Sequence, residues 1–188
     1  MRLFVAVVPP EHAVEHLDAF LEVRRSAAPF RWASAEQLHV TVAFLAEVEE
    51  RRVDDLVERL GRAAARRTSF ETRIAGGGAF PNAARARVLW AGLDLDDAGS
   101  TELDRLATGC RAAANRAGIA VDGQRFRPHV TLARLGHPAE VSSWVQLLDA
   151  YAGPTWRVDR VELVASYLGE GPRRRPRYET VGEFELGG

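Results

Sequence analysis

The stretch LHVTVAFL at residues 38–45 returns almost unchanged in FRPHVTLARL at residues 126–135. The shared words are His39-Val40-Thr41-Val42-Ala43 and His129-Val130-Thr131-Leu132-Ala133, which begin 90 residues apart in a chain of 188. Both words are rich in β-branched residues, so each predicts a strand. A spacing close to half of the chain length is what a duplicated lobe would leave behind.

The rest of the chain alternates between strand and helix patterns. Apolar runs or strand-forming residues predict strands at Leu3–Val8, Leu38–Leu45, Phe70–Ile74, Arg87–Leu93, Phe126–Leu135, Trp156–Leu168 and Tyr178–Leu186. Apolar residues at helical spacing predict helices over residues 10–27, 49–67, 101–117 and 139–152. Gly76–Gly78 is predicted to be a flexible hinge or a bulge. The chain contains no long linker, so we expect one α+β domain over residues 1–188, made of two interlocked lobes.

Composition excludes several classes of function. The 25 basic and 26 acidic residues give a net charge of −1, which argues against binding long nucleic acid by overall charge, although local basic patches remain open. All of the basic residues are arginine, so a lysine nucleophile or Schiff base is excluded. The one cysteine, Cys110, excludes an intramolecular disulfide and is predicted to be a buried thiol. No signal peptide or membrane span is recognised, so we expect a cytoplasmic protein.

The two repeated words place reactive side chains at matching positions. Side chains alternate across a strand, so His39 and Thr41 project from one face about 7 Å apart, and His129 and Thr131 do the same. If both strands face a common cleft, two imidazoles and two hydroxyls surround a small volume. Hydroxyls donate hydrogen bonds to anionic oxygens, and imidazoles exchange protons near neutral pH. The pair suits general acid and base catalysis of phosphodiester cleavage better than metal binding.

Other residues carry weaker signals. Strand alternation puts Arg134 on the face opposite His129, so it reaches the site only past the strand end or across a bulge. Candidates for stacking on an RNA base are Phe4, Phe44, Phe80 and Trp90. Arg173, Arg174, Arg175 and Arg177 form a loop that either grips an RNA backbone or is merely solvated. His12 and His16 share a helix face but lack a third metal ligand.

The paired His-x-Thr words resemble the signature of the 2H phosphoesterase superfamily, and most closely its bacterial RNA 2′,3′-cyclic phosphodiesterases, historically called 2′-5′ RNA ligases. Further similar segments are RLFVAVVPP (2–10), GGAFPNAARARVLWAGL (77–93) and ELVASYLGEGPRRRPRYETV (162–181). The arginine-rich loop at 173–177, and Ala46 where a glycine often follows the first motif strand, depart from the pattern.

The resemblance implies a bilobal α+β fold, in which two pseudo-symmetric antiparallel sheet lobes flanked by helices surround a central cleft. It implies hydrolysis of RNA 2′,3′-cyclic phosphate ends to 2′-phosphates with no metal or other cofactor. Ligation by the reverse reaction would need no ATP. His39 would be the proton donor and His129 the proton acceptor, while Thr41, Thr131 and Arg134 would bind the substrate. The residues alone do not decide which histidine is the acid.

Other functions remain open at this stage. The same chemistry suits a cyclic phosphate on a small nucleotide or an ADP-ribose derivative, and a non-catalytic binder of phosphorylated RNA ends or nucleotides would share the site. A metal-dependent hydrolase would lose its activity to chelators. The expected partner is an RNA or oligonucleotide with a 2′,3′-cyclic phosphate end, bound by a monomer that does not associate with membranes.

Overall fold

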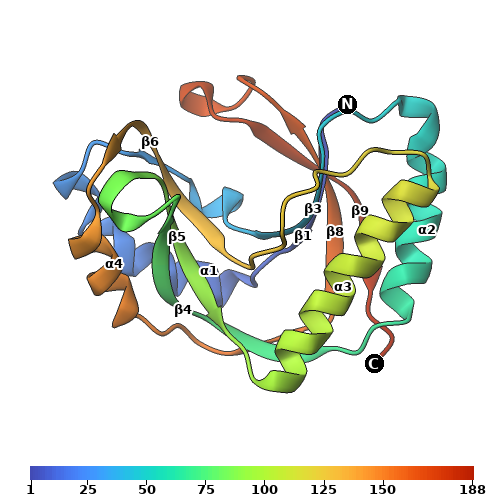
Figure 1. The fold of residues 1–188 in the computed structure, drawn as a ribbon, viewed down its shortest axis with the longest axis horizontal. Coiled ribbons are helices and arrows are strands. Elements are labelled where there is room, and N and C mark those ends of the chain that lie inside the picture. Colours follow the sequence, from blue (N-terminus) through green and yellow to red (C-terminus); the bar gives the residue numbers. More distant parts are fainter.

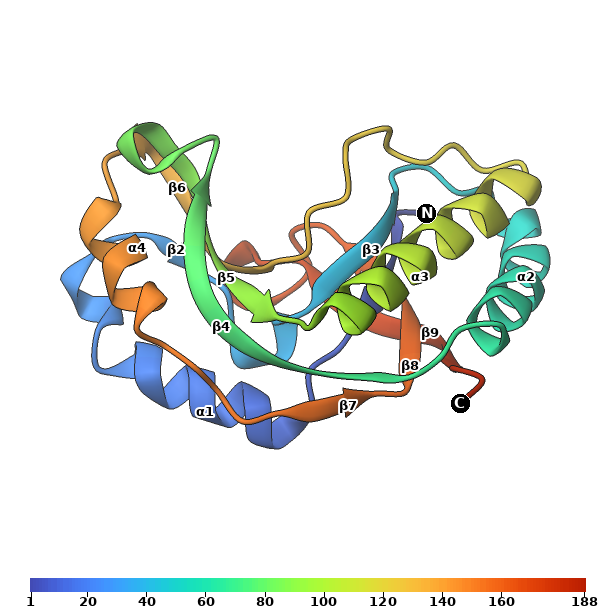
Figure 2. The same cartoon turned by 60° about the horizontal axis from the view of Figure 1, so that its bottom comes forward.

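The computed structural model describes residues 1–188, and its nine strands form one antiparallel sheet. The strands are β1 (Leu3–Val7), β2 (Arg31–Trp32), β3 (Val40–Leu45), β4 (Phe70–Phe80), β5 (Ala86–Asp94), β6 (Val130–Ala139), β7 (Trp156–Val158), β8 (Arg160–Tyr167) and β9 (Arg177–Glu185). Their order is β7-β4-β5-β6-β3-β1-β8-β9, and the short β2 also pairs with β6. The sheet is strongly curled, as the arc of β4 in Figure 2 shows.

The sheet has two halves that meet at a single residue pair. One half is β7-β4-β5-β6, the other is β3-β1-β8-β9, and the antiparallel pair Val40↔Val130 joins them. We call this junction the seam. Each half contributes the strand that carries its His-x-Thr word to the seam, so the two words lie next to each other. The two lobes predicted from the repeated words correspond to the two halves of this one sheet.

Four helices cover one face of this sheet. In Figure 1, α1 (Glu11–Glu22) and α4 (Ser142–Asp149) lie beside the half that contains β4, β5 and β6. Helices α2 (Val53–Ala65) and α3 (Asp97–Arg116) lie beside the other half. No helix is both long enough and apolar enough to cross a membrane. The α+β class predicted from the sequence is confirmed.

The hydrophobic core lies between the helices and the sheet. One cluster of 43 buried residues joins Leu17 of α1, Leu56 of α2, Leu103 of α3 and Leu148 of α4 to the two valines of the seam. Burying each such leucine contributes roughly 1.5–3 kcal/mol. Because Val40 and Val130 point into this core, the side chains that alternate with them point to the opposite face, away from the helices.

Several predicted boundaries are wrong. The strand expected at Phe126–Leu135 begins at Val130 and continues to Ala139, so His129 lies directly before it. The expected single strand Trp156–Leu168 is divided at Asp159 into β7, which pairs with β4, and β8, which pairs with β1 and β9. These partners belong to different halves of the sheet, so the chain crosses from one half to the other there. The last predicted helix begins at Ser142 and not at Ala139, because β6 continues to Ala139.

The glycine run 76–78 begins at a bulge inside a strand. β4 continues through them to Phe80, and its register against β5 shifts between Ile74 and Gly77. Gly76 adopts a φ of 70°, a conformation that favours glycine. A Cβ on Gly78 would lie 2.2 Å from the indole of Trp90, so only glycine fits beneath that ring. The bulge alternative of the sequence prediction is confirmed.

Candidate active site

The register at the seam brings the two predicted motifs together. Val40 pairs with Val130 in antiparallel orientation, so the next residues face each other as His39 with Thr131 and Thr41 with His129. Directly opposed residues have Cβ atoms about 4.5–5.5 Å apart. All four side chains lie on the face away from the helices. The structure therefore gathers two imidazoles and two hydroxyls around the seam, and each histidine faces the threonine of the other motif.

Backbone carbonyls fix the orientation of both imidazoles. Nδ1 of His39 lies 2.7 Å from the carbonyl oxygen of Gln37, and Nδ1 of His129 lies 2.6 Å from that of Arg127. A carbonyl oxygen only accepts, so each Nδ1 carries a hydrogen and donates it. In the neutral ring, Nε2 is then the nitrogen without a hydrogen. Both histidines thus use Nε2 as the atom that gains and loses a proton.

The His39 ring is enclosed by aromatic side chains. Phe4 stacks on it with ring centroids 4.5 Å apart and planes inclined by 22°, and Tyr178 meets it edge-on at 5.7 Å. Nε2 lies 2.9 Å from Oγ1 of Thr41, which donates to it when the ring is neutral. Burial lowers the pKa of His39 from 6.5 to about 4, although the bond to the Gln37 carbonyl opposes the shift. Free His39 is therefore neutral at physiological pH.

The His129 ring has a more open environment. Phe80 meets it edge-on at 4.9 Å and Trp90 lies 6.1 Å away, measured between ring centroids. Its Nε2 has no hydrogen-bond partner within the protein. Burial and the nearby Arg134 guanidinium lower the pKa of His129, while the bond to the Arg127 carbonyl raises it. Nε2 of His129 is thus available to a water molecule or a substrate.

A β-bulge turns Arg134 toward the histidines. Leu89 of β5 pairs with Ala133, but the next residue, Trp90, pairs with Thr131, so β6 contains one extra residue at Leu132. The extra residue reverses the alternation and places Arg134 on the same face as Thr131. The positive charge of Arg134 lowers the pKa of both His39 and His129. Of the two routes that the sequence left open for this arginine, the structure shows the bulge.

Two supporting residues were not identified from the sequence. Gln37 presents its carbonyl to His39, while its side chain accepts from the Ser34 backbone N–H and donates to the Pro176 carbonyl. Tyr178 encloses His39 from β9, and burial raises its own pKa. Neither residue has a signal in the periodicity of its segment. The contact of Tyr178 with His39 and the bond from the Gln37 side chain to Pro176 join segments that are distant in the sequence, whereas the Gln37 carbonyl lies only two residues before His39.

The remaining candidates have diverse roles. Phe4 is only 4% exposed and packs on His39, so it offers no face to a base, whereas Phe80 and Trp90 remain partly exposed beside His129.

Nδ1 of His16 lies 2.8 Å from the Tyr151 hydroxyl. Arg177 forms ion pairs with two glutamates and lies over a tyrosine ring, so it is already engaged within the protein. The arginines of this loop that remain for an RNA backbone are Arg173, Arg174 and Arg175. Cys110 is buried, and burial raises its pKa to about 12.

A sheet whose two halves each present a His-x-Thr pair at a common seam defines a two-histidine phosphoesterase fold. The comparison with protein families agrees, because the model of the 2′-5′ RNA ligase superfamily matches residues 7–170. The chain belongs to this superfamily.

Curated relatives and a solved structure extend the similarity over the whole chain. The RNA 2′,3′-cyclic phosphodiesterase of Thermus thermophilus is 32% identical, over 100% of this chain and 91% of that protein. The one of Geobacillus stearothermophilus is 29% identical over 97% of this chain, which spans little more than half (56%) of that longer relative. The crystal structure of Escherichia coli LigT complexed with 3′-AMP has a TM-score of 0.73 at 28% identity and covers 100% of this chain and 98% of that one.

Proposed function

We propose that this protein hydrolyses 2′,3′-cyclic phosphate ends of RNA to 2′-phosphates, using His39 and His129 as a general acid and base and no metal ion. The observation that carries the proposal is the seam, where both Nε2 atoms and both threonine hydroxyls share one face. Relatives named RNA 2′,3′-cyclic phosphodiesterase support the substrate class.

In the proposed reaction, each site residue acts on one atom of the substrate. Nε2 of neutral His129 takes a proton from water, and the water oxygen attacks phosphorus. The bond between phosphorus and O3′ breaks, and protonated His39 donates its Nε2 proton to the departing O3′. Thr41, Thr131 and Arg134 donate hydrogen bonds to the non-bridging oxygens, where negative charge develops. The product keeps its phosphate on O2′, and the two histidines have exchanged protonation states.

The lowered pKa values set a condition on this assignment. A base must be neutral, which the lowered pKa of His129 favours. An acid must be protonated, whereas the pKa of His39 is about 4 in the free protein. An anionic phosphate beside His39 favours the imidazolium, so substrate binding raises this pKa toward the working range. The proposed roles of the two histidines follow the family resemblance.

We further propose a cytoplasmic monomer. The one cysteine is buried in α3, which suits a reducing compartment where disulfides are rare.

The test is hydrolysis of a short RNA that ends in a 2′,3′-cyclic phosphate, with EDTA present throughout. We expect turnover by the wild-type protein and a product with a 2′-phosphate. A 3′-phosphate product, or loss of turnover when EDTA is added, would contradict the proposed mechanism. Binding of the RNA without any turnover would instead indicate a sensor of phosphorylated ends. Turnover of a cyclic mononucleotide alone would point to a small-nucleotide substrate.

A further inference from the structure

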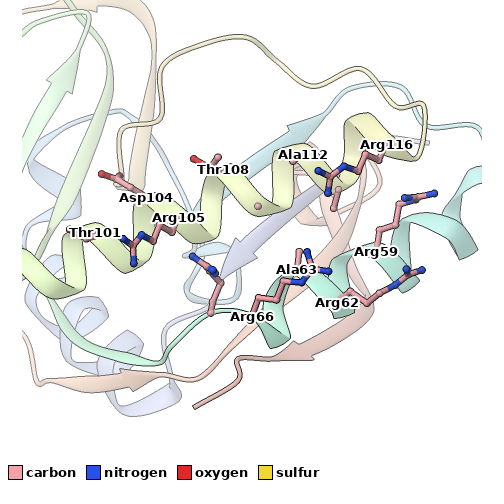
Figure 3. A pocket seen from close by; sticks show the side chains of 13 residues that line it. Arg59, Arg62, Ala63, Arg66, Thr101, Asp104, Arg105, Thr108, Ala112 and Arg116 are labelled. Carbon is pink, nitrogen blue, oxygen red and sulfur yellow. The ribbon is translucent and has the colours of Figure 1, made fainter.

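A basic groove lies between α2 and α3, away from the histidines. It has a volume of about 520 Å³. In Figure 3, the labelled side chains of Arg59 and Arg62 extend from α2, that of Arg66 from the residue directly after it, and those of Arg105 and Arg116 from α3. Arg67, the next residue, also lines it. We call the groove formed by these six arginines the α2–α3 arginine groove.

The charge of this groove differs sharply from that of the whole chain. The chain has 25 basic and 26 acidic residues, yet the only carboxylate that lines the groove is that of Asp104. Guanidinium groups that have no carboxylate beside them repel one another, so an anion between them is favoured. A surface that merely needs to be soluble has no reason to concentrate one sign of charge in this way.

Half of these arginines have no acidic partner. Three of them form ion pairs with carboxylates of their own helix: Arg59 with Asp55 at 3.0 Å, Arg62 with Glu58 at 2.5 Å and Arg105 with Glu102 at 3.3 Å. In contrast, Arg66, Arg67 and Arg116 form no salt bridge and no side-chain hydrogen bond in the structure. These three guanidiniums remain available to an external anion.

The walls of the groove also contain small residues and two threonines. Ala63 of α2 and Gly109 and Ala112 of α3 also line it, and a Cβ on Gly109 would lie 3.9 Å from the Cβ of Ala63, so the two helices pack closely there. Thr101 and Thr108 of α3 also line the groove, and a threonine hydroxyl can donate to a phosphate oxygen. Arginine and hydroxyl donors together are the usual partners of a nucleic-acid backbone.

The dimensions favour a polymer of phosphates. From Thr101 to Arg116, the groove follows α3 for about 22 Å, at a rise of about 1.5 Å per residue, which exceeds the length of one nucleotide. Packed helices have axes about 8–10 Å apart, so the groove between them suits one sugar-phosphate strand better than a duplex. The helices cover the face of the sheet opposite the histidines, so this groove is separate from the candidate active site.

We propose that the α2–α3 arginine groove binds the backbone of single-stranded RNA as a second site, remote from the chemistry. The choice of RNA over other phosphate polymers rests on the proposed function, whereas the choice of a polyanion rests on the charges alone. Binding at this site would hold a long RNA on the protein and so raise the effective concentration of its end near the histidines. A mononucleotide would not gain this advantage.

The test compares two triple variants that remove the same charge. The first is Arg66→Ala/Arg67→Ala/Arg116→Ala in the groove, and the matched control is Arg73→Ala/Arg157→Ala/Arg160→Ala on β4, β7 and β8. Binding of a fluorescent 20-nucleotide single-stranded RNA with a 3′-hydroxyl end is followed by anisotropy over a range of salt concentrations. A 2′,3′-cyclic mononucleotide reports the basal activity.

The groove variant is expected to bind the RNA about tenfold or more weakly. The fall of log K with log salt should also become less steep by about 2, since each of the three lost phosphate contacts contributes about 0.7 to the slope. The control variant should change the affinity less than threefold, and both variants should hydrolyse the mononucleotide like the wild type. Equal effects of the two variants on RNA binding would overturn the proposal. So would binding of poly-glutamate as tight as that of RNA.

The two proposals fail in different ways. If the wild-type protein hydrolyses the cyclic mononucleotide but the groove variant keeps its affinity for RNA, the groove proposal alone is wrong. If the wild-type protein hydrolyses no cyclic phosphate, and the groove variant nevertheless binds RNA more weakly than the wild type, the proposed function is wrong and the groove proposal stands.

Discussion

The two His-x-Thr words are nearly identical in sequence, but the structure gives them different surroundings. His39 is stacked on Phe4, closed in by Tyr178 and hydrogen-bonded through Nε2 to Thr41, and its pKa falls to about 4. His129 meets Phe80 edge-on, and its Nε2 is free. The local geometry is the same in both, because each Nδ1 donates to the carbonyl two residues earlier.

This difference shows how a repeated motif can place two identical side chains in different environments. The motif itself sets the tautomer and the direction of each ring, and these properties are symmetric. The neighbours on other strands set the desolvation, and this property is asymmetric. An acid–base pair needs two groups in opposite protonation states. In the free protein the stronger desolvation favours neutral His39, opposite to the proton-donor role proposed for it, so the bound phosphate has to reverse this preference.

Removal of either imidazole should have the largest effect on activity. His39→Ala and His129→Ala are each expected to lower kcat by about 10²–10⁴-fold on an RNA with a cyclic phosphate end. Since the two groups act in one step, the double variant should be scarcely slower than the slower single variant. His137→Ala, an exposed histidine farther along β6, is the matched control and should leave kcat unchanged. Near-normal turnover in either single variant would contradict the proposal that the two histidines act together as acid and base.

The two threonines should have smaller and unequal effects. Thr41→Val and Thr131→Val each remove one donor to the phosphate, which is expected to cost about 10²-fold in kcat. Thr41→Val should cost more, because Thr41 also holds Nε2 of His39 in the free protein. Thr41→Ser and Thr131→Ser restore the hydroxyl and should recover most of the rate. A larger loss in Thr131→Val than in Thr41→Val would reverse the comparison.

The aromatic neighbours should change the pH dependence more than the rate. Tyr178→Ala opens one side of the His39 ring to water, so the pKa of His39 should rise from about 4 toward 6.5. Phe80→Ala should act in the same way on His129 alone. Each variant is expected to move one limb of the profile of kcat/KM against pH and to leave the other in place. Movement of both limbs by one substitution would show that the two environments are not independent.

Much of the site was predictable from the sequence, because its chemistry lies within two short strands. The spacing of His39 and Thr41, and of His129 and Thr131, depends only on strand alternation. The side of the strand from which Arg134 projects was not predictable, since the bulge at Leu132 appears only in the pairing with β5. The contact of Tyr178 with His39 and the bond from the Gln37 side chain to Pro176 likewise depend on how distant segments pair, and periodicity contains no information about such partners.

The fold shows the same limit. The repeated words predicted two similar lobes, and the structure contains two sheet halves that meet at Val40 and Val130. The division of the Trp156–Leu168 segment at Asp159 was missed, because both parts have strand-like composition and only their partners differ. Local composition thus determines which segments are strands, while tertiary pairing determines where each strand ends.

The most direct test of the paired-histidine account is the profile of kcat/KM against pH for a 2′,3′-cyclic nucleotide. Below both pKa values the two imidazoles are protonated and no base remains, and above both values the two are neutral and no acid remains. Because burial lowers the pKa of His39 to about 4 and also lowers the pKa of His129, we expect a bell whose maximum falls on the acid side of the range usual for histidine. A profile that is flat from about pH 4 to 8, or that is still rising above pH 7, would contradict the account.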